Sequence, residues 1–180
     1  MTDNLSNFIG AIGGILGATS GIYTYWHTGS RVKVKVTIAI RLRTGEHIAL
    51  HRRKFDGTFG HGFDYSGAQL MVRLHARNVG RLPIDVEGAS ITCGKMSMLT
   101  YGTPLAAQFP VRMDFGTSKT WFFPLDMAMD LATFQGARSP IGGSVDLANG
   151  RKPKTWFPMS HAFVMKVINS WNRWNQPSST

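Results

Sequence analysis

The chain has few acidic residues and almost no cysteine. One cysteine in 180 residues excludes a disulfide framework and a cysteine-based zinc site of the usual ligand number. There are 10 Asp and Glu residues against 20 Lys and Arg, so the formal net charge of +10 reflects a shortage of acids. A hydrophobic content of 43% excludes a disordered polycation. A chain of this length and composition is expected to form one basic domain with a hydrophobic core.

The first thirty residues lack positive charge altogether. Every Lys and Arg lies at or after Arg31, and the stretch from Leu5 to Trp26 carries no charged side chain. As a helix these 22 residues would extend about 33 Å, enough for the ~30 Å hydrocarbon core of a bilayer. We therefore expect residues 1–28 to form an N-terminal transmembrane helix. The alternative is a glycine-rich helix that packs inside an oligomer or a virion-like assembly.

Small residues follow a helical spacing within this segment. Gly10, Gly14, Gly17 and Gly21 recur at intervals of four, three and four residues. Such a stripe lets helix backbones approach closely in lipid, where apolar burial alone gives little driving force for association. We expect these four glycines to mediate helix packing and hence a homo-oligomer.

Positive charge follows directly after the apolar segment. The candidate contacts for an anionic partner are Arg31, Lys33, Lys35, Arg52, Arg53 and Lys54. By the positive-inside rule the N-terminus lies outside and the domain in the cytoplasm, as a single-pass membrane protein. These cations would contact anionic membrane lipid. Nucleic acid is the alternative partner, for which Phe59, Phe63 and Tyr65 would supply exposed aromatic rings near the cations.

Residues 29–159 have the pattern of an antiparallel β domain. From Val32 to Leu42 apolar and polar residues alternate, and a second alternating run follows from Leu70 to Ala76. The dipeptide Asn149-Gly150 lies between two strand-like runs and predicts a hairpin turn. The predicted core includes Val34, Val36, Ile38, Val72, Leu74, Ile84 and Trp121, and the predicted exposed residues include Arg41, Arg73 and Arg77.

Two helices are expected in addition. Residues 126–134 place Met127, Leu131 and Phe134 on one helical face. Residues 160–180 are expected to form a short amphipathic helix and tail, with Phe163, Val164, Val167, Ile168 and Trp171 along one side. Six or seven short strands over this length predict a mainly β fold, an immunoglobulin-like antiparallel β-sandwich between the transmembrane helix and the C-terminal helix.

No combination of residues indicates catalysis. His47 and His51 follow Glu46, but this is no helical H-E-x-x-H motif and arginines lie nearby. Cys93 alternates with Ile91 and is expected to be a small core residue. The sequence therefore predicts a non-enzyme with no catalytic residues, no metal site and no cofactor.

Three segments carry a resemblance to a known group of proteins. They are Val72–Pro83 (VRLHARNVGRLP), Thr120–Leu131 and Asp146–Arg151 (DLANGR). In this order, behind a short span, they resemble small uncharacterised membrane-anchored β-sandwich proteins of actinobacteria and their phages. The resemblance implies a sandwich fold and transfers no functional residue.

Two functions are compatible with these features. The first is a membrane-anchored, non-catalytic binding module for an unknown protein partner. If phage-encoded, it would act at the host envelope in superinfection exclusion or immunity. The alternative is a structural component of a viral particle or assembly, with a basic surface that faces nucleic acid.

Overall fold

A computed structural model of the protein describes residues 14–21, 31–59, 62–99, 109–136 and 139–175. Residues 14–21 are helical, and the remaining described residues form eight strands and two longer helices. The strands are β1 (Val32–Arg41), β2 (His47–Leu50), β3 (Gln69–Asn78), β4 (Ile84–Cys93), β5 (Met96–Leu99), β6 (Val111–Met113), β7 (Ser118–Pro124) and β8 (Ile141–Leu147). The helices are α2 (Leu125–Phe134) and α3 (His161–Asn175).

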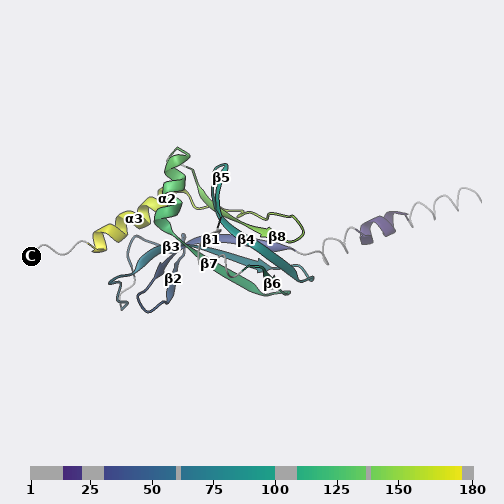
Figure 1. Ribbon diagram of the computed structural model, residues 1–180, viewed down its shortest axis with the longest axis horizontal. Coiled ribbons are helices and arrows are strands. Elements are labelled where there is room, and N and C mark those ends of the chain that lie inside the picture. The colour runs from purple at the N-terminus through teal and green to yellow at the C-terminus, as the bar shows by residue number, and fades with distance from the viewer. Residues whose placement is uncertain (1–13, 22–30, 60–61, 100–108, 137–138, 176–180) are drawn as a thin grey trace, which may run out of the picture.

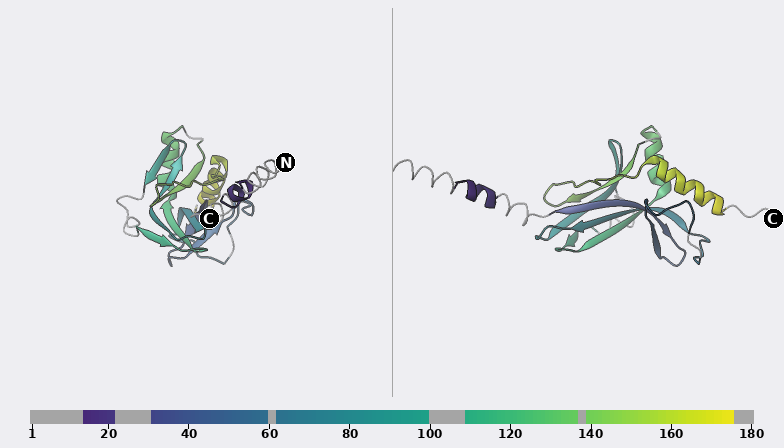
Figure 2. Two further views of the ribbon diagram at one scale, coloured as in Figure 1. Left: turned by 90° about the vertical axis from the view of Figure 1, so that its right-hand side faces the viewer. Right: turned by 180° about the vertical axis from the view of Figure 1, so that it is seen from behind.

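The strands form two antiparallel sheets that lie face to face (Figure 1). The first sheet has the order β2-β1-β3-β7, and in the second sheet β4 pairs with β5, β6 and β8. Figure 2 shows the two layers, with α2 and α3 at the same end of them. The expected mainly β architecture with two packed antiparallel sheets is thus confirmed.

Alternation in the sequence correctly predicts the buried face of the first sheet. All of the predicted core residues are buried, namely Val34, Val36, Ile38, Val72, Leu74, Ile84 and Trp121. Arg41 and Arg77 are exposed as predicted, but the expectation of an exposed Arg73 is wrong, because this side chain is half-buried. Arg73 lies on the middle of the sheet between Thr37 of β1 and Phe122 of β7, which flank its aliphatic stem.

Asn78, at the end of β3, connects the two sheets. Its fully buried side chain donates hydrogen bonds from Nδ2 to the carbonyl oxygens of Leu82 (2.8 Å) and Met113 (2.9 Å). Its Oδ1 accepts a hydrogen bond from the backbone N–H of Gly80 at 3.0 Å. Because Met113 belongs to the second sheet, this one amide fixes the β3–β4 turn against β6.

The two sheets approach closely at Gly143 of β8. A Cβ built on this residue would overlap Cδ1 of Leu74 and lie 2.9 Å from Cγ2 of Val36. Both of those side chains belong to the first sheet and are buried. The glycine therefore allows the two layers to pack without a gap at their centre.

Helix α2 packs through a different face from the one predicted. Its buried residues are Leu125, Ala128 and Ala132, while the predicted Met127 and Phe134 are exposed. The predicted face was defined by large apolar side chains alone. The two alanines let the helix approach the sheet so closely that the Cys93 thiol lies 3.8 Å from the carbonyl oxygen of Ala128. Burying this small-residue face turns the larger side chains toward solvent.

The predicted Asn149-Gly150 hairpin turn is confirmed. Gly150 has a φ of 78° and its N–H donates to the carbonyl oxygen of Leu147 at 2.8 Å. The chain then returns along β8 as residues 151–159, through bridges at Lys154 and Met159. This returning segment forms the border of the second sheet beside β8.

The predicted transmembrane helix lies mostly outside the described residues. Of residues 1–28, only 14–21 are described, and Gly10 is not among them. None of the helices in the described ranges is long and apolar enough to cross a bilayer.

The close contact at Gly143 yields a stability prediction. Gly143→Ala should lower the free energy of unfolding by about 1–3 kcal/mol, because the added methyl group must displace Leu74 and Val36. Gly88→Ala is the matched control, since the nearest atom there is the movable Oδ2 of Asp146 at 3.3 Å. Urea denaturation of both variants measures the difference. Equal losses would contradict the inferred role of Gly143.

Candidate functional site

The outer face of the first sheet gathers positive charge from two paired strands. Lys33, Lys35 and Arg41 of β1 alternate with the buried valines and isoleucines, and Arg73 and Arg77 of β3 do the same. We call these five residues the basic face. The strand register brings them together, because it pairs Lys33 with Arg77 and Thr37 with Arg73.

This charge is not compensated within the sheet. None of the four described strands β1, β2, β3 and β7 contains an Asp or Glu. Directly opposed like charges, such as Lys33 and Arg77, destabilise an antiparallel pair. A face that keeps such pairs without acids offers a favourable site to a polyanion, since binding would relieve the repulsion.

Two histidines, His47 and His75, lie on the same face, and burial and the nearby cations lower the pKa of both. The ring of His47 stacks on Phe122 with centroids 3.7 Å apart, and His75 Nδ1 lies 3.0 Å from Thr120 Oγ1 in a hydrogen bond. Burial lowers the pKa of His75 from its ordinary value, and the charges of Arg73, Lys35 and Arg77 lower it further. Burial also lowers the pKa of His47, with added repulsion from Arg41 and Arg73.

The structure divides the cations that were predicted from sequence. Lys33 and Lys35 lie on the basic face, whereas Arg52, Arg53 and Lys54 are exposed in the turn that follows β2. Arg31 immediately precedes β1, where its carbonyl oxygen accepts hydrogen bonds from Val79 and Gly80.

Sequence reasoning missed that β3 belongs to this site. The outward parity of Arg73 and Arg77 was predictable from alternation, but the pairing of β3 with β1 was not. That pairing makes Arg73 and Arg77 neighbours of the two predicted lysines.

The aromatic loop that was expected to face nucleic acid is largely part of the core. Phe59 and Tyr65 are buried, and only Phe63 of the three is exposed. Trp171 of α3 covers both buried rings edge-on, at centroid distances of 5.4 Å from Phe59 and 6.1 Å from Tyr65. The prediction of an exposed cluster is therefore wrong, because α3 packs on this loop.

Titratable side chains elsewhere form no concentrated group. Within the described ranges, no three His, Cys, Asp or Glu residues are placed to hold a metal ion. The Cys93 thiol is buried, and burial raises its pKa. It therefore has the environment of a core side chain and lacks the electropositive, accessible surroundings of a nucleophile.

Among the residues that the structure describes, none lies against the described part of the glycine stripe. A Cβ added at Gly14, Gly17 or Gly21 would meet no atom within 4 Å. The adjacent Ile15 and Leu16 are exposed.

The lowered histidine pKa values predict a pH dependence of stability. Below about pH 6.5 the histidines of the unfolded chain bind protons more readily than those of the folded chain. The stability that the neutral histidines contribute is therefore fully present above this pH and is lost as the pH falls. His75→Gln should reduce the loss between pH 7.5 and 5.5 at low ionic strength, measured by thermal unfolding. His51→Gln, an exposed site off the basic face, is the control. An unchanged slope in His75→Gln would contradict this account.

The chain was also compared with known proteins. No protein-family model and no curated protein matches it.

Proposed function

We propose that the protein is a membrane-anchored, non-catalytic binding module that holds its basic face against an anionic lipid surface. The observation that carries this proposal is the charge of Lys33, Lys35, Arg41, Arg73 and Arg77 on two neighbouring strands, in a sheet whose four described strands contain no Asp or Glu. Each Lys or Arg near an anionic leaflet contributes about 1 kcal/mol. Five such residues on one flat face give enough attraction to orient a tethered domain.

The N-terminal segment supports the anchor. Helical residues 14–21 belong to the charge-free run, and Ile15 and Leu16 are exposed there. The Thr19 hydroxyl donates to the carbonyl oxygen of Ile15 at 2.8 Å, and the Ser20 hydroxyl donates to that of Gly17 at 2.9 Å. Polar groups satisfied within their own helix are compatible with a lipid environment.

The position of the charges sets the proposed topology. The first cation follows the charge-free run by five residues, and Lys33 lies at most about 25 Å along the chain from Trp26. The positive-inside rule then places the N-terminus outside and the domain in the cytoplasm, with one span. In this arrangement the basic face lies within reach of the inner leaflet. The glycine stripe at Gly14, Gly17 and Gly21 would join copies of the helix into a homo-oligomer.

The finer identity of the domain is part of the same proposal. Two packed antiparallel sheets, with the chain crossing from one to the other after β3, after β6 and after β7, support an immunoglobulin-like sandwich. If the protein is phage-encoded, as its resemblance to membrane-anchored phage proteins would allow, the proposed action is at the host envelope, in superinfection exclusion or immunity.

One observation favours the alternative of a structural protein with a nucleic-acid-facing surface. The stacked pair of His47 and Phe122 places flat rings among the cations of the basic face. Aromatic rings beside Lys and Arg are the usual elements of single-strand binding. The proposed anchor favours lipid as the partner, because it would hold the basic face beside a bilayer.

The anchor is tested by fractionation. The full chain should sediment with membranes, resist extraction by high salt and dissolve in mild detergent. Deletion of residues 1–28 should release a soluble domain with a cooperative thermal unfolding transition. A full chain that stays in the supernatant after ultracentrifugation without detergent would contradict the anchor.

The basic face is tested with vesicles and this released domain. It should bind phosphatidylglycerol vesicles and not phosphatidylcholine vesicles in a flotation assay. Combining Lys35→Glu with Arg77→Glu should weaken binding by at least about 30-fold, since about 2 kcal/mol of attraction is lost and two repelling charges are added. Lys95→Glu combined with Lys119→Glu makes the same charge change off the basic face and should have a much smaller effect.

Two results would count against this proposal. An equal loss in both double variants would mean that net charge alone governs binding. Tighter binding to a single-stranded oligonucleotide than to vesicles at the same ionic strength would favour the alternative.

A further inference from the structure

The first half of β1 has an open edge. β3 pairs with β1 along all ten residues, but β2 pairs only with Ile38–Arg41. The pairing of β2 stops at Leu50, and a turn follows in which Lys54 N–H donates to the carbonyl oxygen of His51 at 2.9 Å. In the part of the chain that the structure describes, Val32–Thr37 therefore has no strand neighbour on the side of β2.

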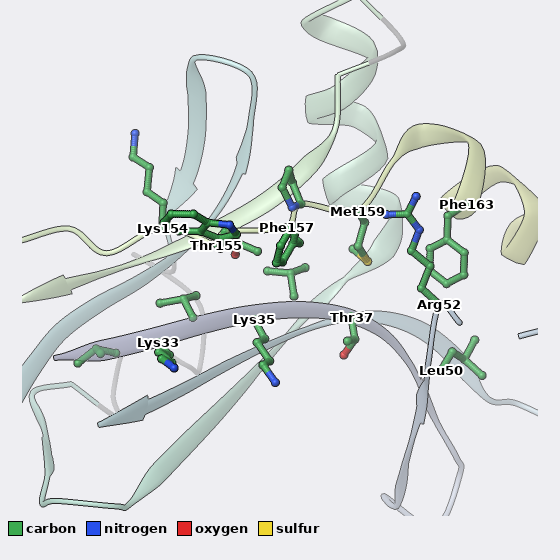
Figure 3. Close-up of a pocket in the computed structure, with 15 residues that line it drawn as sticks. Lys33, Lys35, Thr37, Leu50, Arg52, Lys154, Thr155, Phe157, Met159 and Phe163 are labelled. Carbon is green, nitrogen blue, oxygen red and sulfur yellow. The ribbon is translucent and has the colours of Figure 1, made fainter. Parts of the chain in front are cut away.

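A cavity of about 540 Å³ lies beside this open edge. It separates β1 from the returning segment 154–159, as Figure 3 shows. Val34 and Val36 line it from the first sheet, and Phe157, Met159 and Phe163 line it from the opposite side. The cavity is thus mainly apolar and opens between the borders of the two sheets.

Two aromatic side chains at this cavity are exposed although their backbone is held in place. Trp156 is 85% exposed and Phe157 is 79% exposed. The segment that carries them is fixed to β8, because Thr155 N–H donates to the carbonyl oxygen of Gly143 and Met159 N–H to that of Ile141, both at 2.8 Å. Rigid, exposed aromatic residues are typical anchors of protein interfaces.

The charges at the cavity have one sign. Lys33, Lys35, Arg52 and Lys154 are among its lining residues, and no acid is among those that the structure describes there. In Figure 3, Lys33 and Lys35 extend from β1 on the side away from Phe157. An apolar side and a cationic side therefore flank the same open strand edge.

We propose that this edge binds an extended acidic segment of a partner protein as an added β-strand. A strand that continues the line of β2 would pair with Val32–Thr37 and span about 20 Å. Because its side chains alternate, every second one would enter the apolar cavity near Phe157. The others would lie beside Lys33 and Lys35, where carboxylates are favoured. The recognised segment is therefore about six residues long, with apolar and acidic residues in alternation.

The same charges exclude a second copy of β1 as the added strand. β1 itself alternates valine with lysine, so edge-to-edge pairing of two copies would oppose Lys33 and Lys35 to identical residues. Lysines at an open edge are a common protection against self-pairing. Here they leave an acidic strand as the compatible occupant.

The experiment uses the full chain in phosphatidylcholine nanodiscs and two synthetic peptides. One peptide alternates glutamate and valine over seven residues, and the other alternates lysine and valine. The glutamate peptide should bind in fluorescence anisotropy and the lysine peptide should not. Hydrogen exchange should then show slowing at every second amide of Val32–Thr37, because alternate N–H groups point to the open edge.

A matched pair of variants distinguishes binding at the cavity from non-specific binding to exposed aromatic rings. Phe157→Ala should weaken binding of the glutamate peptide about tenfold. Phe134→Ala removes a ring that is also 79% exposed, but on α2, and should leave binding unchanged. Equal binding of both peptides, equal effects of both variants, or binding without slowed exchange in Val32–Thr37 would each overturn the proposal. The outcome of this experiment does not depend on the vesicle test of the basic face, because Phe157 is not part of that face. The two proposals can therefore fail separately.

Discussion

The arrangement of the two sheets depends on the buried amide of Asn78. Its side chain holds the β3–β4 turn and the end of β6, while its backbone pairs with the β6–β7 turn through Gly116 and Thr117. Both connections cross from one sheet to the other at the same end of the sandwich. A buried amide left without these partners would cost the full desolvation of several polar groups. This constraint fixes the end of β3 against β6 and the β6–β7 turn.

Strand β1 combines three roles because its two faces and its free edge differ. One face supplies valines and isoleucines to the core, and the other carries Lys33, Lys35 and Arg41. The edge at Val32–Thr37 leaves backbone groups without a strand partner in the described chain. The same two lysines thus belong to the basic face and border the cavity. Their strict alternation, visible in the sequence, separates an apolar from a cationic surface within one strand.

The alternation of apolar and polar residues predicted which side chains of the first sheet are buried and which cations lie on its outer face. Strand adjacency was not predictable, because pairing depends on which distant segments share a buried face; Arg73 and Arg77 were therefore assigned to no site. Helix α2 was found but its face was wrong, because the buried face carries the small residues Ala128 and Ala132, whereas the prediction considered only large apolar side chains. Phe59 and Tyr65 were misplaced because their partner, Trp171, lies more than a hundred residues further along the chain.

The contact at Gly143 ties the size of one residue to the size of another in a different sheet. There is no room for a side chain at 143 while Leu74 and Val36 keep their volumes. A sequence that gains a methyl group at 143 must therefore lose volume at 74 or 36 to keep the same spacing between layers. Among chains that share this fold, these positions should covary: larger residues at 143 should accompany smaller ones at 74, although the two lie far apart in the sequence.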